Sequence, residues 1–248
     1  MDIEEIKTIR RSSVVILGNF NPAILHPEWL DRNQVLPPTE VRDIAESKEG
    51  EVRDLEGLKV KFIASNVLVS GSETRLSLPS YQITVTPDRF EAVTVIKEKF
   101  EELYEFVAET FKILAHTPVN ALGINFISSL KFSKSARDLM HHYFCAKPEA
   151  ISSVFGEHSL IDSRIRYDYE DSKVTLLFRV DEEKDEISID FNYHKDFSEN
   201  EGVAMLIEYL LENFKPMMLD ADKVIKGLFG EPTHGGKEDE KPVKNNNG

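Results

Sequence analysis

The chain has 248 residues, 41% hydrophobic and 30% charged, which is enough for a real core in one large domain or two small ones. Its formal charge of −14 argues against a nucleic-acid partner, because binding to a phosphate backbone depends on clustered Lys and Arg. The single cysteine, Cys145, cannot form an internal disulfide, and the first residues lack the basic and apolar segments of a signal peptide. No apolar run approaches the length of a membrane span. We therefore predict a cytoplasmic protein that does not associate with membranes.

The first third of the chain alternates between apolar and polar stretches. Residues 1–11 are charged and predict a short helix or an arm. Residues 13–20 form a continuous apolar run, which is typical of a strand buried on both faces. Residues 27–33 predict a short helix that begins near a proline, and the acidic residues of 37–57 predict a solvated connector with one turn of helix. Strands are expected next at 59–69 and 75–85.

The strongest local signal runs from residue 86 to residue 127. Thr86, Pro87 and Asp88 match the start of a helix, because a hydroxyl caps a free N–H, proline fits the first turn and a carboxylate suits the positive end of the helix dipole. Apolar residues recur every three or four positions as far as Leu114, so we expect a helix of about 42 Å from Asp88 to residue 115. Residues 119–127 then predict a strand that begins just after Pro118.

The second half repeats this sequence of patterns. A helix is expected from Ser133 to residue 144, followed by three alternating strands and a last helix that starts at a Ser198–Glu201 capping box. Pro216 should kink or end that helix, and Asp220 is expected to cap a further segment. The three strands are expected at 161–169, 174–180 and 187–193. From residue 231 the composition predicts a disordered tail, residues 231–248.

Both halves therefore read as strand, short helix, antiparallel strands and long helix. This order predicts one α+β domain, residues 1–230, with related halves at 12–116 and 117–230. Its sheet would be curved and mainly antiparallel, with two long helices on one face. The arrangement resembles the TATA-binding-protein-like or helix-grip class of folds in topology. That resemblance implies a fold and carries no function.

The first candidate site follows the strand at 13–20. Asn19, Asn21, His26 and the only tryptophan, Trp29, cluster after a buried strand, and Asn125 lies in the strand that opens the second half. Two amides and an imidazole at a strand end could form a pocket for a small ligand. The alternative is a turn in which the Asn side chains bond the local backbone and Trp29 anchors a helix to the core.

Two other clusters are weaker candidates for a metal. His141, His142 and Cys145 place two possible zinc ligands on one helix face, but the sequence lacks a third ligand at a recognisable spacing. The acidic residues at 168–171 and 181–185 lack the glycine-centred spacing of a calcium loop, and they fall where hairpin turns are expected. We predict no metal site and no cofactor.

The sequence also lacks the glycine-rich and nucleophile motifs of common enzyme families. We therefore expect a soluble protein-binding or assembly module without catalytic activity. Its partner would be another protein or a second copy of the chain, since a sheet covered on one face leaves a docking surface. The alternative is a small-ligand-binding protein or an atypical enzyme with a pocket near residues 19–29.

Overall fold

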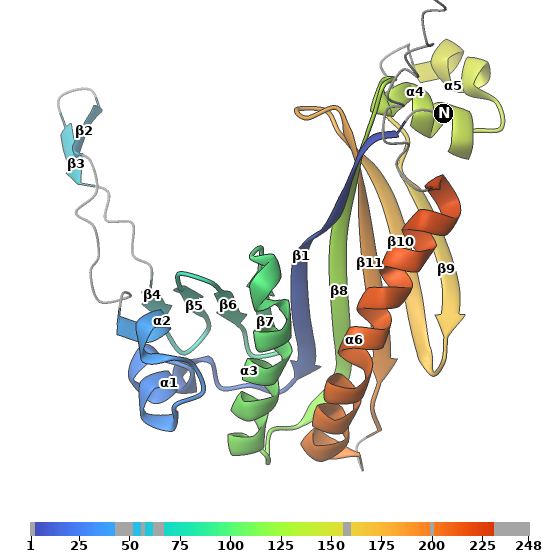
Figure 1. Cartoon of the computed structure of the whole chain (residues 1–248). Helices are drawn as coiled ribbons and strands as arrows, with labels where there is room; N and C mark the ends of the chain where they lie inside the picture. The colour runs from blue at the N-terminus through green and yellow to red at the C-terminus, as the bar shows by residue number, and fades with distance from the viewer. Residues whose placement is uncertain are drawn as a thin grey trace, which may run out of the picture.

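The computed structural model describes residues 3–42, 52–55, 58–61, 67–155, 160–198 and 201–230. Its main feature is an open, nine-stranded antiparallel sheet in the order β4–β5–β6–β7–β1–β8–β11–β10–β9 (Figure 1). The α+β class and the antiparallel sheet predicted from the sequence are confirmed. The predicted disordered tail lies outside the described residues. The strands are β1 (Ile3–Gly18), β4 (Val67–Val69), β5 (Thr74–Ser77), β6 (Gln82–Val85), β7 (Arg89–Thr94), β8 (Val119–Phe132), β9 (Ser163–Tyr169), β10 (Ser172–Asp181) and β11 (Glu186–Asp196), with a separate hairpin of β2 (Val52–Leu55) and β3 (Leu58–Lys61).

The two longest strands, β1 and β8, lie side by side at the centre of the sheet. Ser12 pairs with Phe126 in this antiparallel ladder, which continues as far as Ile3 and Phe132. The short helix or arm expected before residue 12 is therefore wrong for residues 3–11, which belong to β1. The ladder to β8 supplies their backbone hydrogen bonds, and a register shift between Lys7 and Arg11 accommodates an irregularity there.

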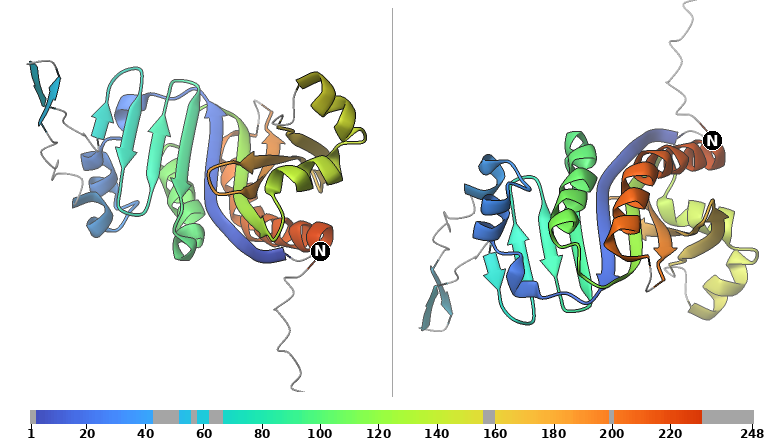
Figure 2. Two further views of the ribbon diagram at one scale, coloured as in Figure 1. Left: turned by 90° about the horizontal axis from the view of Figure 1, so that it is seen from above. Right: turned by 90° about the horizontal axis from the view of Figure 1, so that it is seen from below.

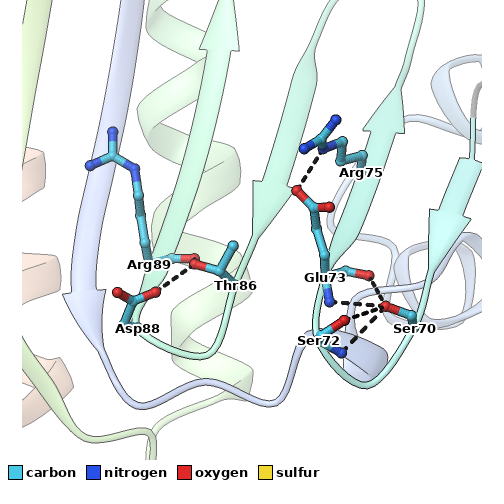
Figure 3. Close-up of polar contacts among 7 residues, drawn as sticks. All are labelled: Ser70, Ser72, Glu73, Arg75, Thr86, Asp88 and Arg89. Carbon is cyan, nitrogen blue, oxygen red and sulfur yellow. Dashed lines mark hydrogen bonds and ion pairs between the residues drawn. The ribbon is translucent and has the colours of Figure 1, made fainter.

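A tight turn joins β4 to β5 (Figure 3). The Ser70 hydroxyl accepts hydrogen bonds from the backbone N–H groups of Ser72 (3.3 Å) and Glu73 (3.0 Å), and it donates to the Glu73 carbonyl (2.9 Å). The single strand predicted at 75–85 is a hairpin of β5 and β6. Pro79 lies in its turn, where the missing N–H leaves no gap in the ladder.

A second turn replaces the predicted start of the long helix (Figure 3). The Thr86 hydroxyl donates to the Asp88 carboxylate at 2.7 Å, and the Thr86 backbone N–H donates to the Arg89 carbonyl at 2.7 Å. The chain therefore reverses into β7. Thr86 and Asp88 are polar partners at a hairpin turn, and the helix expected from residue 88 is wrong at its start.

The helix itself, α3 (Phe100–Ile113), begins after a short 3-10 turn, η3 (Lys97–Lys99). Phe90 and Val93 fit a helical stripe, but residues 89–94 also alternate. Phe90 and Ala92 are fully buried, whereas Arg89 and Glu91, which precede them, are more exposed. Pairing with β1 on one side and β6 on the other supplies a ladder for these residues, which a local pattern cannot reveal.

α3 and α6 (Gly202–Phe229) pack against each other and on the same face of the sheet (Figure 2). Aromatic rings fill the space between the helices and the strands. Phe214 of α6 lies 5.3 Å from Phe126 of β8 and 4.7 Å from Tyr104 of α3, measured between ring centroids. Phe111 of α3 packs edge-to-face on Phe90 at 5.1 Å. The core therefore lies between this helix pair and one face of the sheet.

α6 continues through Pro216 and Asp220, the two residues expected to break or restart it. Asp220 accepts hydrogen bonds from the hydroxyls of Tyr193 (2.8 Å) and Tyr167 (3.3 Å), which project from β11 and β9. Burial raises the pKa of both phenols, that of Tyr167 to about 12. Asp220 is therefore a polar anchor between helix and sheet and caps no helix.

Short helices cover the ends of the sheet: η1 (Pro22–Ile24), α1 (Pro27–Asn33), α2 (Pro38–Arg42), α4 (Ala136–Phe144) and α5 (Pro148–Phe155). The buried carboxylate of Glu40 fixes α2 to the β5–β6 turn, because it accepts hydrogen bonds from the Ser80 hydroxyl (2.5 Å) and backbone N–H (3.0 Å). None of the helices that the structure describes is long and apolar enough to cross a membrane.

Candidate functional site

The face of the sheet opposite α3 and α6, here called the helix-free face, is hollowed at its centre. Side chains alternate along a strand, so Ser13 and Val15 point to this face while Val14 and Ile16 are fully buried in the core. A concavity of about 400 Å³ lies here, and all of its lining residues belong to β1, β7, β8, β10 and β11. The sheet alone therefore forms the floor and walls of this hollow.

Two further concavities adjoin the central one. The first, of about 140 Å³, shares Arg11 with it and extends to Gln82 of β6. The other, of about 460 Å³, shares Asn192 and His194 with it and extends to Arg166 of β9. We call the three together the trough. It crosses seven strands, from β6 to β9, which at a strand spacing of about 4.8 Å corresponds to about 29 Å.

A row of polar side chains crosses the middle of the trough, and hydrogen bonds join three of them, Ser13, Asn125 and Asn192. Ser13 of β1, Asn125 of β8, Asn192 of β11 and Thr175 of β10 lie opposite one another in the strand register. The Asn125 amide donates to the Ser13 hydroxyl (3.1 Å), and the Asn192 amide donates to the Asn125 carbonyl oxygen (2.5 Å). Because each amide NH₂ has two hydrogens, each Asn keeps one donor beyond this row.

The floor beside this row is made of small and apolar residues. Gly123 lies next to Asn125 on the same face, and Val15 and Ala121 are buried around it. A Cβ added at Gly123 would meet the Asn192 amide nitrogen at 3.4 Å and the Val15 Cβ at 3.6 Å, which are ordinary contacts. The glycine therefore keeps the hollow deep, and the backbone does not require it.

Charged side chains form the rim, and several are paired. Arg89 contacts Glu91 at 3.2 Å, and Arg179 contacts Asp190. The His194 ring is 2.8 Å from Asp196, and this hydrogen bond holds the pKa of the Asp196 carboxyl below its usual range. Other rim charges are unpaired: among the described residues, Arg11 and Arg166 take part in no ion pair. The apolar floor and the charged rim together suit a ligand that is apolar at its centre and polar around it.

Of the five residues predicted to form a site, only one lies in the trough. Asn125 lies in the trough, but Asn19, Asn21, His26 and Trp29 line none of its three concavities. Residue 19 is six positions beyond Ser13 along the chain, about 20 Å in an extended strand. The structure therefore does not place Asn125 with the other four.

Those four residues build the turn and helix that follow β1. The Asn21 side-chain Oδ1 accepts from the Ala23 N–H at 3.2 Å, which caps η1. The His26 Nδ1 accepts from the Trp29 N–H at 3.3 Å, which caps α1, and Trp29 packs against the core. The Asn19 N–H donates to the Pro118 carbonyl at 2.9 Å. These contacts match the alternative reading of this segment, that of a turn with local hydrogen bonds.

Ser13, Asn192 and Arg11 were not among the site residues predicted from the sequence. For Asn192 one signal was available, because polar residues occupy every second position of β11 between Ile187, Ile189, Phe191 and Tyr193. Arg11 and Ser13 carry no such signal, since Ser12 lies between them and apolar residues follow. Nothing local, however, shows that β1, β8, β10 and β11 are neighbours. That information lies in the sheet order.

The contacts of the trough do not include an activated nucleophile. Ser13 bonds to an amide, while the imidazole of His194 bonds to Asp196, so no hydroxyl–base pair arises among these residues. Among the residues that the structure describes, no group of three His, Cys, Asp or Glu side chains could hold a metal ion.

Comparison of the sequence with protein-family models and with curated proteins gave no match.

Proposed function

We propose that the chain is a protein-binding module without catalytic activity, and that its partner docks in the trough. The observation that carries this proposal is the polar row of Ser13, Asn125 and Asn192 on the open face of the sheet. Hydroxyl and amide groups both donate and accept hydrogen bonds, as a peptide backbone does. An extended segment of a partner would find matching groups along this row.

The surroundings of the row support a protein partner. Val15, Ala121 and Gly123 give an apolar centre, and Arg11, Arg89 and His194 lie around it. An apolar centre inside a polar rim is the usual composition of a protein interface. The length of the trough, about 29 Å at ordinary strand spacing, also exceeds what a small ligand needs.

A second candidate is a small-ligand-binding protein. The central concavity of about 400 Å³ falls within the size range of ligand pockets, and the amides of Asn125 and Asn192 converge on it. This hypothesis shifts the predicted ligand site from residues 19–29 to the helix-free face. A ligand there would raise the unfolding temperature of the wild type in a screen of small polar compounds.

We further propose that the fold consists of two related halves, 12–116 and 117–230, as in TATA-binding-protein-like or helix-grip folds. The element order supports this, because β1, short helices, β4–β7 and α3 are followed by β8, short helices, β9–β11 and α6. The sheet order supports it as well, since β1 and β8 are central and the remaining strands of each half extend outward from them. Superposition of the halves in a crystal structure would test it, and no common backbone path would argue against it.

The trough can be tested with one substitution that fills it. Gly123→Leu keeps the polar row, and its side chain would occupy the central concavity. Leu219→Ala is the matched control, because Leu219 is 66% exposed on α6, which covers the other face. Each variant and the wild type would be immobilised and exposed to lysate of the native cell, with bound proteins identified by mass spectrometry.

The proposal predicts a protein that binds the wild type and Leu219→Ala and is depleted at least tenfold on Gly123→Leu. Circular dichroism and thermal unfolding would verify that Gly123→Leu is folded. If Gly123→Leu retains every partner, the trough is not the docking surface. If no protein binds the wild type while a small compound stabilises it, the second candidate is favoured.

A further inference from the structure

One long edge of the sheet is unpaired in the described chain. β9 lies at the outer end of the sheet order and pairs only with β10 (Figure 1). Its side chains at Arg164, Ile165, Arg166 and Asp168 are exposed. An edge strand presents unpaired backbone N–H and C=O groups that can pair with another strand. The opposite edge strand, β4, has only three residues.

Charge along β9 has an unusual order. Arg164 and Arg166 occupy its first part, whereas Asp168 and the following turn residue Glu170 are acidic. Arg164, Arg166 and Asp168 alternate along the strand and therefore point to the helix-free face. Among the described residues, none of these four charged side chains takes part in an ion pair or a hydrogen bond, although the backbone of β9 pairs with β10. A basic half followed by an acidic half is complementary to itself when two copies run antiparallel.

We infer that two copies of the chain pair through β9, antiparallel and with Tyr167 of each copy on the two-fold axis. In that register Arg166 of one copy lies opposite Asp168 of its partner, and Arg164 lies beside Glu170 in the turn that ends the partner's β9. The two-fold axis generates each pair twice, so four unpaired ions of each copy gain a partner of opposite sign. Opposite charges that face each other across neighbouring strands stabilise the pairing.

The other face of β9 fits the same register. Ile165 of one copy lies opposite Tyr169 of its partner, and the two Tyr167 side chains meet at the axis. Ile165 is 37% exposed in the single chain, so pairing would cover an apolar side chain with an aromatic one. Such pairs of a β-branched and an aromatic residue are favourable between strands.

Alternative registers are less favourable. Moving the axis to Arg166 brings Arg166 of the two copies face to face, and moving it to Ile165 places Arg164 opposite Arg166. Like charges directly opposite each other destabilise a strand pair. A two-fold axis perpendicular to the sheet keeps each side chain on its own face, so residues that lie opposite each other must point to the same face. The axis must therefore pass between two copies of the same residue. The charge order of β9 therefore selects the register centred on Tyr167.

Pairing through β9 uses the edge of the sheet and does not depend on which ligand occupies the trough. The self-association expected from the sequence would then be a dimer in which β9 of one copy pairs with β9 of a second copy. The dimer would have one continuous sheet, with the helices of both copies on the same face.

Charge exchange tests the register directly. One variant, Arg164→Glu with Arg166→Asp, makes the edge acidic, and the other, Asp168→Arg with Glu170→Arg, makes it basic. Each would be measured by size-exclusion chromatography with light scattering and by sedimentation equilibrium, alone and in a one-to-one mixture. Because four attractive contacts become repulsive, each variant alone should dimerise about 100-fold more weakly than the wild type, on the basis of cross-strand pair energies.

The two variants mixed together should restore the dimer, because every facing pair is again opposite in sign. Wild-type dimerisation should also weaken in 1 M salt, which screens exposed charges. Gly123→Leu should dimerise like the wild type, which separates this test from that of the trough. A wild type that stays monomeric at 100 µM would overturn the inference. So would undiminished dimers of either variant alone, or a mixture of folded variants that does not associate. Circular dichroism would establish folding, and if either variant failed to fold, a wild-type dimer insensitive to salt would overturn the register.

Discussion

The anchor of α6 to the sheet gives the sharpest prediction about stability. The Tyr193 hydroxyl is buried and donates to the Asp220 carboxylate at 2.8 Å, while Tyr167 reaches the same carboxylate at 3.3 Å. Tyr193→Phe removes the shorter hydrogen bond and leaves the ring in place. The change therefore isolates one polar contact between helix and sheet.

Hydrogen bonds to charged groups contribute about 1.5–3 kcal/mol each. Tyr193→Phe should thus lower the free energy of unfolding by about 2 kcal/mol, which in a domain of this size corresponds to about 4–8 °C in Tm. Tyr167→Phe should cost less, about 0.5–1 kcal/mol, because its hydrogen bond is longer and its side chain is only half-buried. Tyr169→Phe is the matched control, since this neighbouring tyrosine of β9 donates no hydrogen bond in the described structure.

Urea unfolding followed by circular dichroism would measure all three variants. A double-mutant cycle of Tyr193→Phe with Asp220→Ala would then isolate the pair, and the expected coupling is about 1–2 kcal/mol. A loss below 0.5 kcal/mol for Tyr193→Phe, equal to that of Tyr169→Phe, would refute the view that this hydrogen bond anchors α6.

Three further predictions concern packing and pH. Phe214→Ala should cost about 3–5 kcal/mol in urea unfolding, because it empties the centre of the core between α3, α6 and β8. Gly18→Ala should destabilise the protein by about 1–3 kcal/mol, since the new Cβ would lie 2.2 Å from the Pro118 carbonyl oxygen. Gly71→Ala is its control, because a Cβ there meets nothing within 4 Å and should change stability by less than 0.5 kcal/mol in the same assay. The pKa of Tyr167 is raised to about 12 by burial, so the folded state favours the neutral phenol. This contribution to stability is complete below pH 10 and is lost between pH 10 and 12, which absorbance at 295 nm and urea unfolding at each pH would reveal.

Sequence patterns predicted the elements whose secondary structure follows from the local spacing of apolar residues. The alternation of apolar residues predicted β9, β10 and β11, because strands with one covered face repeat every two residues. The proline at residue 27 predicted the start of α1. The helical stripe predicted the body of α3, but its start was wrong. Residues 89–94 satisfy both periods, and only pairing with β1 and β6 makes them a strand.

The candidate site depended on tertiary structure almost entirely. Ser13, Asn125 and Asn192 are far apart in the chain, and they meet because β1, β8 and β11 are consecutive in the sheet. The sequence by itself determined the α+β class, most strands and the polar character of one strand face, since these follow from local spacing. Only the tertiary structure decided that β1 extends back to Ile3 and that residue 88 lies in a hairpin turn. It also decided which polar side chains lie together in the trough. The order of strands in a sheet cannot be predicted from local sequence, because the hydrogen bonds between strands join residues that are far apart in the chain.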